Sequence, residues 1–265
     1  MPSGSELGAG REKAKKFWEY KAKRYPLPFE ERSLKTTKKV IDIVKGRGVV
    51  IRNARILDIG CGTGNYTLPL AQEARAVIGV DFSESMISRL TEELEKHHFQ
   101  NVSTLCASWK DLDITSPYFE KAFDIVWSSM SMAVREEEDV RKMEACSRNW
   151  CVYIGWGGKR KNPLMEEIFK IHDTAFLPPP GANNISAILN QIGRRHSLDF
   201  IETSWDWCGT CDEAAEDISA HIEFFGGTPI TEEIKDIVSK HSQDGLLKHT
   251  TDAKLGIITW QVKDL

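Results

Sequence analysis

Short apolar runs and amphipathic segments alternate through the middle of the chain. The apolar runs are predicted strands, and they cover residues 55–59, 76–80, 102–106, 123–128 and 150–155. The segments between them have apolar residues at helical spacing, and helices are predicted at 65–73, 84–96 and 135–147. Because strand and helix alternate over short connections, we predict an α/β, Rossmann-like fold with a doubly wound, mostly parallel sheet and helices on both faces.

The two ends of the chain depart from this alternation. Residues 1–10 have no apolar core and are expected to form a flexible N-terminus, followed by predicted helices that Pro26 and Pro28 separate. The remaining predicted helices cover residues 11–24, 34–44, 162–175, 184–195, 211–224 and 231–241. Two late strands, 198–205 and 255–263, bring the sheet to seven strands. Residues 206–254 are interpreted as a helical insertion between these last two strands.

Composition favours one folded domain. Apolar residues make up 41% of the 265 residues, so residues 11–265 are predicted as a single domain, with N-terminal helices over 11–45 and a core over 55–155. The formal net charge of -4 gives no sign of nucleic-acid binding. No apolar run reaches about 18 residues, so no membrane span is expected. Six cysteines are too few for a disulfide scaffold, and without a signal-peptide layout at the N-terminus they favour a reducing cytoplasm.

A glycine-rich turn follows the first central strand. The segment Ile56–Gly64 reads ILDIGCGTG and places Gly60, Gly62 and Gly64 between a strand and a helix. Glycines allow positive φ and let a ligand lie against the backbone, and the free amides of the next helix favour an electron-rich group. Asp58 stands just before the turn, where it could accept hydrogen bonds from a ligand ammonium or order the loop.

A second acid, Asp81, ends the next strand. A carboxylate at this position can accept two hydrogen bonds from ribose hydroxyls. Alone, each feature is more often a helix cap than a ligand site. Together, in a strand–turn–helix–strand context, they indicate a nucleoside site.

The glycine spacing distinguishes between nucleosides. A dinucleotide fingerprint reads G-x-G-x-x-G, whereas this chain reads G-x-G-x-G from Gly60 to Gly64. That spacing, preceded by Leu57 and Asp58, resembles the first motif of class I S-adenosylmethionine-dependent methyltransferases. The resemblance covers roughly residues 56–155 and implies S-adenosyl-L-methionine as the cofactor, with Asp81 as the ribose-binding acid.

The same resemblance implies which residues line the cofactor. They are Trp18, Tyr25, Asp58, Gly60, Cys61, Gly62, Asp81, Phe82, Ser83, Met86, Ser108, Trp109 and Ser128. Trp18 and Tyr25 belong to N-terminal helices that resemble a lid, although an aromatic face packed on the sheet is equally compatible with them. The family commonly has Asp where this chain has Ser108, so the chain departs from the family pattern at this position. Trp109 could cover the adenine or simply pack in the core.

The methyl acceptor is less well defined by the sequence. Tyr20, Met130 and Trp156 are candidate substrate contacts, and His172 is a weak candidate for a catalytic base. The chain has neither the Asn/Asp-Pro-Pro-aromatic motif of amino-methylating nucleic-acid enzymes nor the Pro-Cys nucleophile of cytosine-C5 enzymes. We therefore predict a small-molecule acceptor and an enzyme that is a monomer or homodimer.

Other interpretations remain open. The chain could methylate a protein side chain, could be a non-catalytic S-adenosylmethionine-binding module, or could be a nicotinamide-dependent oxidoreductase, which the glycine spacing disfavours. Cys208 and Cys211 form one C-x-x-C pair, but a structural zinc site usually needs four ligands, so no metal is predicted.

Overall fold

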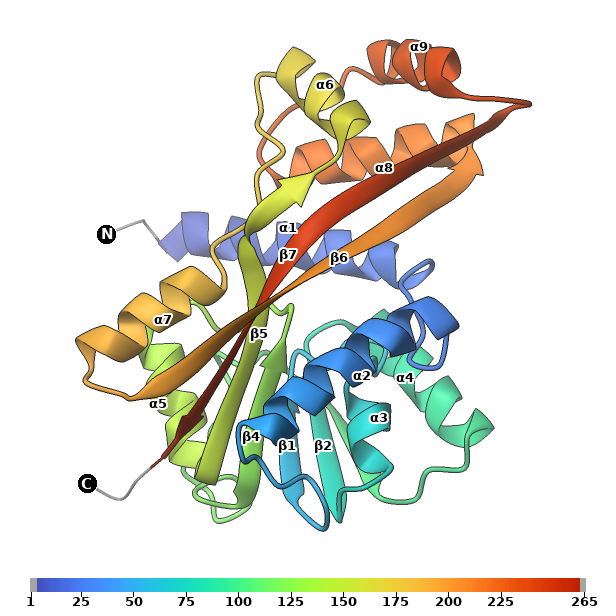
Figure 1. Cartoon of the computed structure of the whole chain (residues 1–265). Helices are drawn as coiled ribbons and strands as arrows, with labels where there is room; N and C mark the ends of the chain where they lie inside the picture. Colours follow the sequence, from blue (N-terminus) through green and yellow to red (C-terminus); the bar gives the residue numbers. More distant parts are fainter. Residues whose placement is uncertain (1–3, 263–265) are drawn as a thin grey trace. The chain divides into compact units, whose positions relative to one another are not determined.

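The computed structural model describes residues 4–262, with side chains from residue 10 onward. Its seven strands form one sheet in the order β3-β2-β1-β4-β5-β7-β6 (Figure 1). The strands are β1 (Arg55–Ile59), β2 (Ala76–Asp81), β3 (Val102–Cys106), β4 (Phe123–Ser129), β5 (Ser147–Lys161), β6 (His196–Thr210) and β7 (Leu246–Gln261). The pairings from β3 through β5 are all parallel, which confirms the predicted doubly wound, Rossmann-like sheet.

Nine helices lie within the described residues. They are α1 (Gly4–Ala22), α2 (Glu31–Gly46), α3 (Thr67–Ala71), α4 (Glu84–Lys96), α5 (Glu137–Cys146), α6 (Pro163–Ile171), α7 (Ala182–Gln191), α8 (Cys211–Phe224) and α9 (Thr231–His241). Helices α4, α8 and α9 have the predicted bounds. Helix α1 begins at Gly4, whereas the sequence pattern predicted a start at residue 11, so the predicted N-terminal segment 1–10 is helical from Gly4 onward; residues 1–3 lie outside the described part.

The chain divides into two compact units, where the sequence predicted a single domain. The large unit comprises residues 18–157, 180–201 and 255–262, and the small unit comprises residues 4–17, 158–179 and 202–254. Strands β5, β6 and β7 each begin in one unit and end in the other. Helices α8 and α9 fall between β6 and β7 in the chain, and the small unit that contains them also includes α6.

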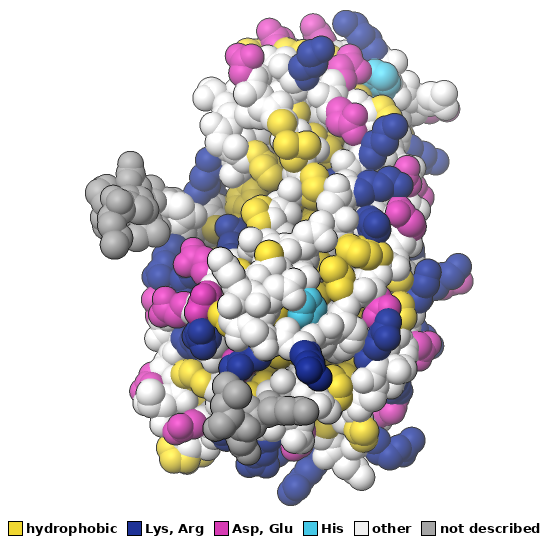
Figure 2. Space-filling view, turned by 60° about the vertical axis from the view of Figure 1, so that its left-hand side comes forward, with side chains coloured by type: hydrophobic (Ala, Val, Ile, Leu, Met, Phe, Trp, Pro, Cys, Tyr) yellow, Lys and Arg dark blue, Asp and Glu magenta, His cyan; other side chains and the backbone are white. Residues whose placement is uncertain are grey.

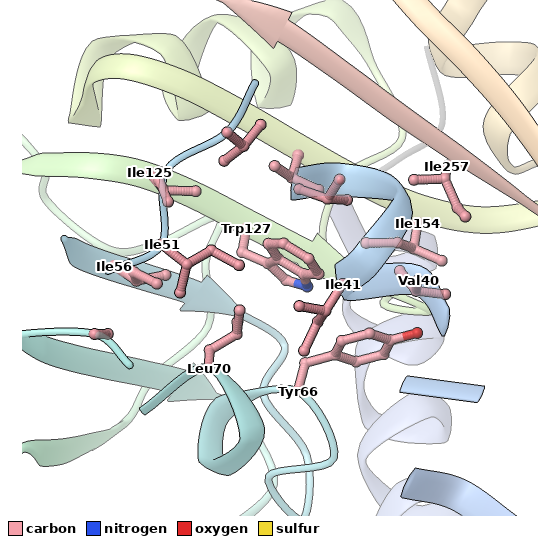
Figure 3. Packing of buried hydrophobic residues seen from close by; sticks show 14 of the residues in the cluster. Val40, Ile41, Ile51, Ile56, Tyr66, Leu70, Ile125, Trp127, Ile154 and Ile257 are labelled. Carbon is pink, nitrogen blue, oxygen red and sulfur yellow. The ribbon is translucent and has the colours of Figure 1, made fainter. Parts of the chain in front are cut away.

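Both faces of the sheet in the large unit are covered by apolar side chains. On one face, Val40, Ile41 and Val44 of α2 pack with strand residues around the fully buried ring of Trp127 (Figure 3). On the other face, helices α5 and α7 contribute Val140, Met143, Ile185 and Leu189 to a second cluster. Because strand residues alternate between faces, Ile56 enters the first cluster and Leu57 the second. This double burial fixes the register of the central strands.

The small unit has its own apolar cluster. Helix α6 contributes Leu164, Ile168 and Phe169, and these pack with residues from α8 and α9 such as Ile218 and Ile234. The amphipathic spacing of all three helices was visible in the sequence, and it now has a physical explanation, because each helix buries its apolar side within this unit.

Candidate active site at the glycine turn

The glycine turn leaves β1 with backbone geometry that only glycine adopts readily. Gly60, Gly62 and Gly64 have φ values of +72°, +53° and +92°. A Cβ atom on Gly60 would lie 2.0 Å from Oγ of Ser131, and one on Gly64 would lie 2.5 Å from a methyl group of Leu90. Around Gly62, in contrast, the nearest atom is Sδ of Met86 at 4.0 Å. The turn is therefore tightly packed at both ends and open at its centre.

Asp81 links this turn to the end of β2. Its buried carboxylate accepts a 2.9 Å hydrogen bond from the backbone N–H of Gly62 and another of 2.9 Å from the N–H of Ser83. Burial raises the pKa of Asp81, while the backbone donors of Ser83, Gly62 and Phe82 act in the opposite direction. The carboxylate is therefore fixed at the carboxyl edge of the sheet, next to the open centre of the turn.

Asp58 lies inside the same edge of the sheet. Its side chain is 1% exposed, and one carboxylate oxygen accepts a 2.6 Å hydrogen bond from the hydroxyl of Thr67. The other oxygen is enclosed and has no partner. Burial, with a smaller contribution from the charge of Asp81, raises the pKa of Asp58 to about 7. An enclosed acceptor without a partner is costly, so this oxygen is suited to a hydrogen-bond donor from outside the protein.

Residues 18–33, here called the N-terminal strap, are hydrogen-bonded to the glycine turn. The carbonyl oxygen of Pro26 accepts hydrogen bonds from Thr63 Oγ1 at 2.7 Å and from Asn65 Nδ2 at 2.9 Å. The hydroxyl of Ser33 donates to Asn65 Oδ1 at 2.6 Å. Thr63 belongs to the motif that the sequence singled out and Asn65 directly follows it, so the strap is attached to the turn directly.

The aromatic residues of the strap lie close to the acidic groups. The rings of Trp18 and Tyr25 meet edge to face, with centroids 5.9 Å apart. Burial raises the pKa of Tyr25 to about 12, and the nearby charge of Asp81 contributes to this rise. Tyr20, also in the strap, is half-buried. The structure therefore brings Trp18 and Tyr25 to the acidic edge of the sheet.

The start of α4 forms another wall of the site. The buried hydroxyl of Ser83 caps the helix by accepting a 3.2 Å hydrogen bond from the N–H of Met86. Met86 is buried and Phe82 is half-buried. Cys61, within the turn, is buried, and its side chain occupies the space beside Gly79. Burial raises the pKa of the Cys61 thiol, which keeps it protonated and unreactive at neutral pH.

Trp109 belongs to the core. The ring is 3% exposed, and Nζ of Lys142 on α5 lies 4.7 Å from a ring centroid. This is a cation–π contact, and the indole Nε1 is enclosed and has no hydrogen-bond partner. Ser108, the residue before it, is half-buried near the start of the loop that follows β3. Both residues stay predictions as cofactor contacts.

The end of β4 contributes mainly backbone structure. Ser128 is fully buried and donates its hydroxyl to the carbonyl oxygen of Ile59 on β1 at 3.2 Å, so its side chain joins two strands. Met130 has a φ of +50°, and its N–H donates to Ile154 at 2.8 Å. Trp156 is half-buried, and its backbone is so close to Gly181 that any side chain there would clash with it.

His172 belongs to the small unit and is engaged by the backbone on both ring nitrogens. Nδ1 lies 2.8 Å from the carbonyl oxygen of Ile168, and Nε2 accepts a 2.9 Å hydrogen bond from the N–H of Ile230. In this arrangement Nδ1 donates to a carbonyl oxygen and the lone pair of Nε2 accepts a hydrogen bond, so no lone pair is left to accept a proton from a substrate. The geometry therefore argues against the prediction of His172 as a catalytic base.

Several residues at the site were missed by the sequence analysis. Thr67 and Ser131 lie against the predicted Asp58 and Gly60. Glu19 accepts a hydrogen bond from Ser85, two residues after Ser83, and Tyr66 lies beside Trp127 with ring centroids 5.5 Å apart. Only Thr67 had a local signal, because it opens the helix after the turn. The structure shows no group of three or more His, Cys, Asp or Glu residues that could hold a metal ion within residues 4–262.

Comparison with known proteins agrees with this geometry. Residues 56–150 match a family model described as a methyltransferase domain. An uncharacterized protein of Haemophilus influenzae is 28% identical over 64% of this chain and 60% of its own length. Phosphoethanolamine N-methyltransferase 3 of Arabidopsis thaliana is 37% identical over 35% of this chain and 19% of its own. The 23S rRNA (uracil(1939)-C(5))-methyltransferase RlmD of Aliivibrio fischeri is 35% identical over 29% of this chain and 16% of its own length.

The chain thus spans less than two thirds of the length of each of these relatives. Among solved structures, the YcgJ protein of Bacillus subtilis superposes with a TM-score of 0.52 at 16% identity, covering 86% of this chain and 99% of that one. At this identity the likeness concerns the fold. The matched family model and the shared fold agree that residues 56–150 form a methyltransferase domain.

Proposed function

We propose that this chain transfers the methyl group of S-adenosylmethionine to a small-molecule acceptor. The observation that carries the proposal is the position of Asp81, whose carboxylate is held by Gly62 and Ser83 beside the open centre of the glycine turn. A carboxylate fixed there can accept hydrogen bonds from ribose hydroxyls.

The residues present fit this cofactor. The space over Gly62 would be narrowed by a side chain, and the enclosed oxygen of Asp58 lacks a donor that an ammonium group could supply. We assign Asp58 to the methionine part of the cofactor and Asp81 to the ribose. Trp18 and Tyr25 would cover it from the strap. Further cofactor contacts are assigned to Gly60, Cys61, Phe82, Ser83, Met86 and Ser108, with weaker assignments for Trp109 and Ser128.

The protein's part in the chemistry is positioning. The cofactor supplies both the methyl group and its leaving group, so the chain must align the acceptor with the methyl group and exclude water. The aromatic rings of Trp18 and Tyr25 are suited to the exclusion of water, and their π faces favour a cationic sulfonium. Tyr20, Met130 and Trp156 remain the candidate contacts for the acceptor.

A small-molecule acceptor is favoured over RNA by the charge of the chain. The net charge is -4, and Figure 2 shows basic and acidic side chains interspersed on the face in view. The Arabidopsis relative is named for a small molecule and the Aliivibrio relative for ribosomal RNA, so both acceptor classes need to be tested. No described helix is both long and apolar enough to cross a bilayer. We propose a cytoplasmic location and a monomer or homodimer.

Calorimetry tests the proposal directly. The protein should bind S-adenosylmethionine and S-adenosylhomocysteine, but not NAD, because the glycine spacing does not match the dinucleotide fingerprint. Binding of NAD alone would overturn it. Transfer of a radiolabelled methyl group to a small-molecule extract, compared with transfer to total RNA and to protein, then identifies the acceptor class. Label found only in RNA or protein would overturn the small-molecule assignment and leave the cofactor assignment intact.

A further inference from the structure

Glu19 is a strap residue whose position no motif explains. It lies in the last turn of α1, and its Oε2 accepts a 3.1 Å hydrogen bond from the N–H of Ser85 in the first turn of α4. Its second carboxylate oxygen, Oε1, is enclosed and has no hydrogen-bond partner. One half of the carboxylate therefore caps a helix, while the other half lacks a donor.

The side chain is an anion at neutral pH. Burial acts to raise the pKa of Glu19, but hydrogen bonds from Ser85 and Ser83 and the backbone donors of the α4 N-terminus outweigh it, so the pKa is lowered. The free N–H groups of a helix N-terminus stabilise a negative charge in the same way. The oxygen without a partner thus belongs to an ionised carboxylate, which makes it a strong acceptor.

Glu19 and Asp81 both lie beside Ser83. The N–H of Ser83 donates to Asp81 at 2.9 Å, and the side chain of Ser83 acts to lower the pKa of Glu19. The charge of Glu19 also acts to raise the pKa of Asp81, as expected for neighbouring carboxylates. Two carboxylates this close repel each other unless donors lie between them.

We propose that Glu19 is a second ribose-binding carboxylate, so that Glu19 and Asp81 each accept a hydrogen bond from one hydroxyl of the cofactor's vicinal diol. The proposal rests on the assignment of S-adenosylmethionine as cofactor and extends it to a residue outside the methyltransferase motif. A diol offers two adjacent O–H donors, which matches two adjacent anionic acceptors. The strap would then bind the ribose by a direct hydrogen bond as well as covering the cofactor.

A thermodynamic cycle between the protein and the ligand tests this inference. Affinities of wild type and Glu19→Gln are measured by calorimetry for S-adenosylhomocysteine and for its 2′-deoxy and 3′-deoxy analogues. Glu19→Gln should weaken S-adenosylhomocysteine binding by about tenfold or more. It should have little effect on the analogue that lacks the hydroxyl bound by Glu19, because that contact is already missing.

Two further variants separate ligand recognition from helix capping. Glu84→Gln removes a charge from an exposed side chain at the same end of α4 and should leave all three affinities unchanged. Glu19→Asp keeps the charge but withdraws the carboxylate, so it should lose the discrimination between ligands even if Glu19→Gln does not fold.

The outcomes are distinguishable. Equal losses for all three ligands would show that Glu19 only caps α4, and unchanged affinities would also overturn the inference. If wild type fails to bind S-adenosylhomocysteine at all, the proposed cofactor falls and the role of Glu19 falls with it.

Discussion

The hydroxyl of Thr67 donates a 2.6 Å hydrogen bond to one oxygen of Asp58, and the other oxygen of that carboxylate is enclosed without a partner. Thr67 stabilises the ionised form, but burial outweighs it and brings the pKa to about 7. The relationship between these two residues therefore leaves the free protein with an acid that titrates near neutrality, and the stability of the fold should depend on pH through it.

Asp58→Asn should remove this dependence. Asp58 has an ordinary pKa of 3.8 and a pKa of about 7 in the fold, so between these values the native state holds more protons than the unfolded chain. The contribution of Asp58 to the free energy of unfolding is full below about pH 4 and falls as pH rises to about 7. The loss is at most about 4 kcal/mol. Asparagine does not titrate, and its amide oxygen can still accept from Thr67.

Urea unfolding of both proteins from pH 4 to pH 8, without cofactor, measures this effect. As pH rises, the free energy of unfolding of wild type should fall relative to that of Asp58→Asn. A difference that is constant across this range would show that Asp58 keeps an ordinary pKa. Because Asp81 titrates in both proteins, its own contribution largely cancels in the comparison.

The glycines of the turn should differ in their tolerance of alanine. Gly60→Ala places Cβ against Ser131 and also strains a backbone with φ of +72°, so it should destabilise the fold by about 3 kcal/mol or more. Gly62→Ala meets no atom closer than 4.0 Å and should cost about 1 kcal/mol from its φ of +53°. Thermal unfolding of the two variants measures the contrast.

A double variant checks the cause. Adding Ser131→Gly to Gly60→Ala removes the clashing side-chain atoms but not the backbone strain, so it should restore only part of the lost stability. Gly62→Ala, although folded, should bind S-adenosylhomocysteine more weakly because its methyl group enters the space assigned to the cofactor. Unchanged affinity would place the cofactor elsewhere.

Asp81→Ala should weaken cofactor binding. Loss of the carboxylate removes hydrogen bonds to the ribose, with an expected loss of about 1–3 kcal/mol in S-adenosylhomocysteine affinity by calorimetry. Part of that loss is indirect, because the N–H groups of Gly62 and Ser83 lose the acceptor that holds the turn in place. Asp113→Ala, at an exposed acid that accepts hydrogen bonds from Thr115, is the control and should bind normally. Equal affinities for wild type and Asp81→Ala would remove Asp81 from the site.

His172→Ala should affect stability and not the cofactor. The variant leaves the N–H of Ile230 without its partner and removes one of the two donors to the carbonyl of Ile168, at a cost of about 1–3 kcal/mol. Affinity for S-adenosylhomocysteine should stay within about twofold of wild type, because the backbone already engages both ring nitrogens. The exposed His241→Ala in the same unit is the control for stability. A catalytic role would instead appear as lost methyl transfer at normal stability.

Local patterns predicted the central elements well where their ends carry a sequence signal. The bounds of β1, β3 and α4 agree with the prediction; the glycine turn follows β1, and Ser83 caps α4. The long strands were underestimated. Strand β5 continues to Lys161 through Gly157 and Gly158, which the sequence pattern made resemble a loop, and Gly158 has a φ of +89° within the strand.

In the candidate site too, some residues could be predicted from the sequence and others could not. Asp58, Gly62 and Asp81 are recognisable because the motif that positions them is continuous along the chain. Glu19 was not recognisable, because its hydrogen-bond partner Ser85 lies 66 residues away and neither residue type is unusual for an exposed helix. Contacts between distant segments leave no periodic trace in a single sequence.

The route of the chain between the two units has an evolutionary consequence. The boundaries fall after residues 17, 157, 179, 201 and 254, so no continuous stretch contains one unit whole and excludes the other. A recombination event that exchanged a terminal portion of the gene would therefore disrupt at least one unit. Diversification of such a scaffold is expected to proceed by point substitution and by loop-length change, and laboratory chimaeras should be built with several coordinated junctions.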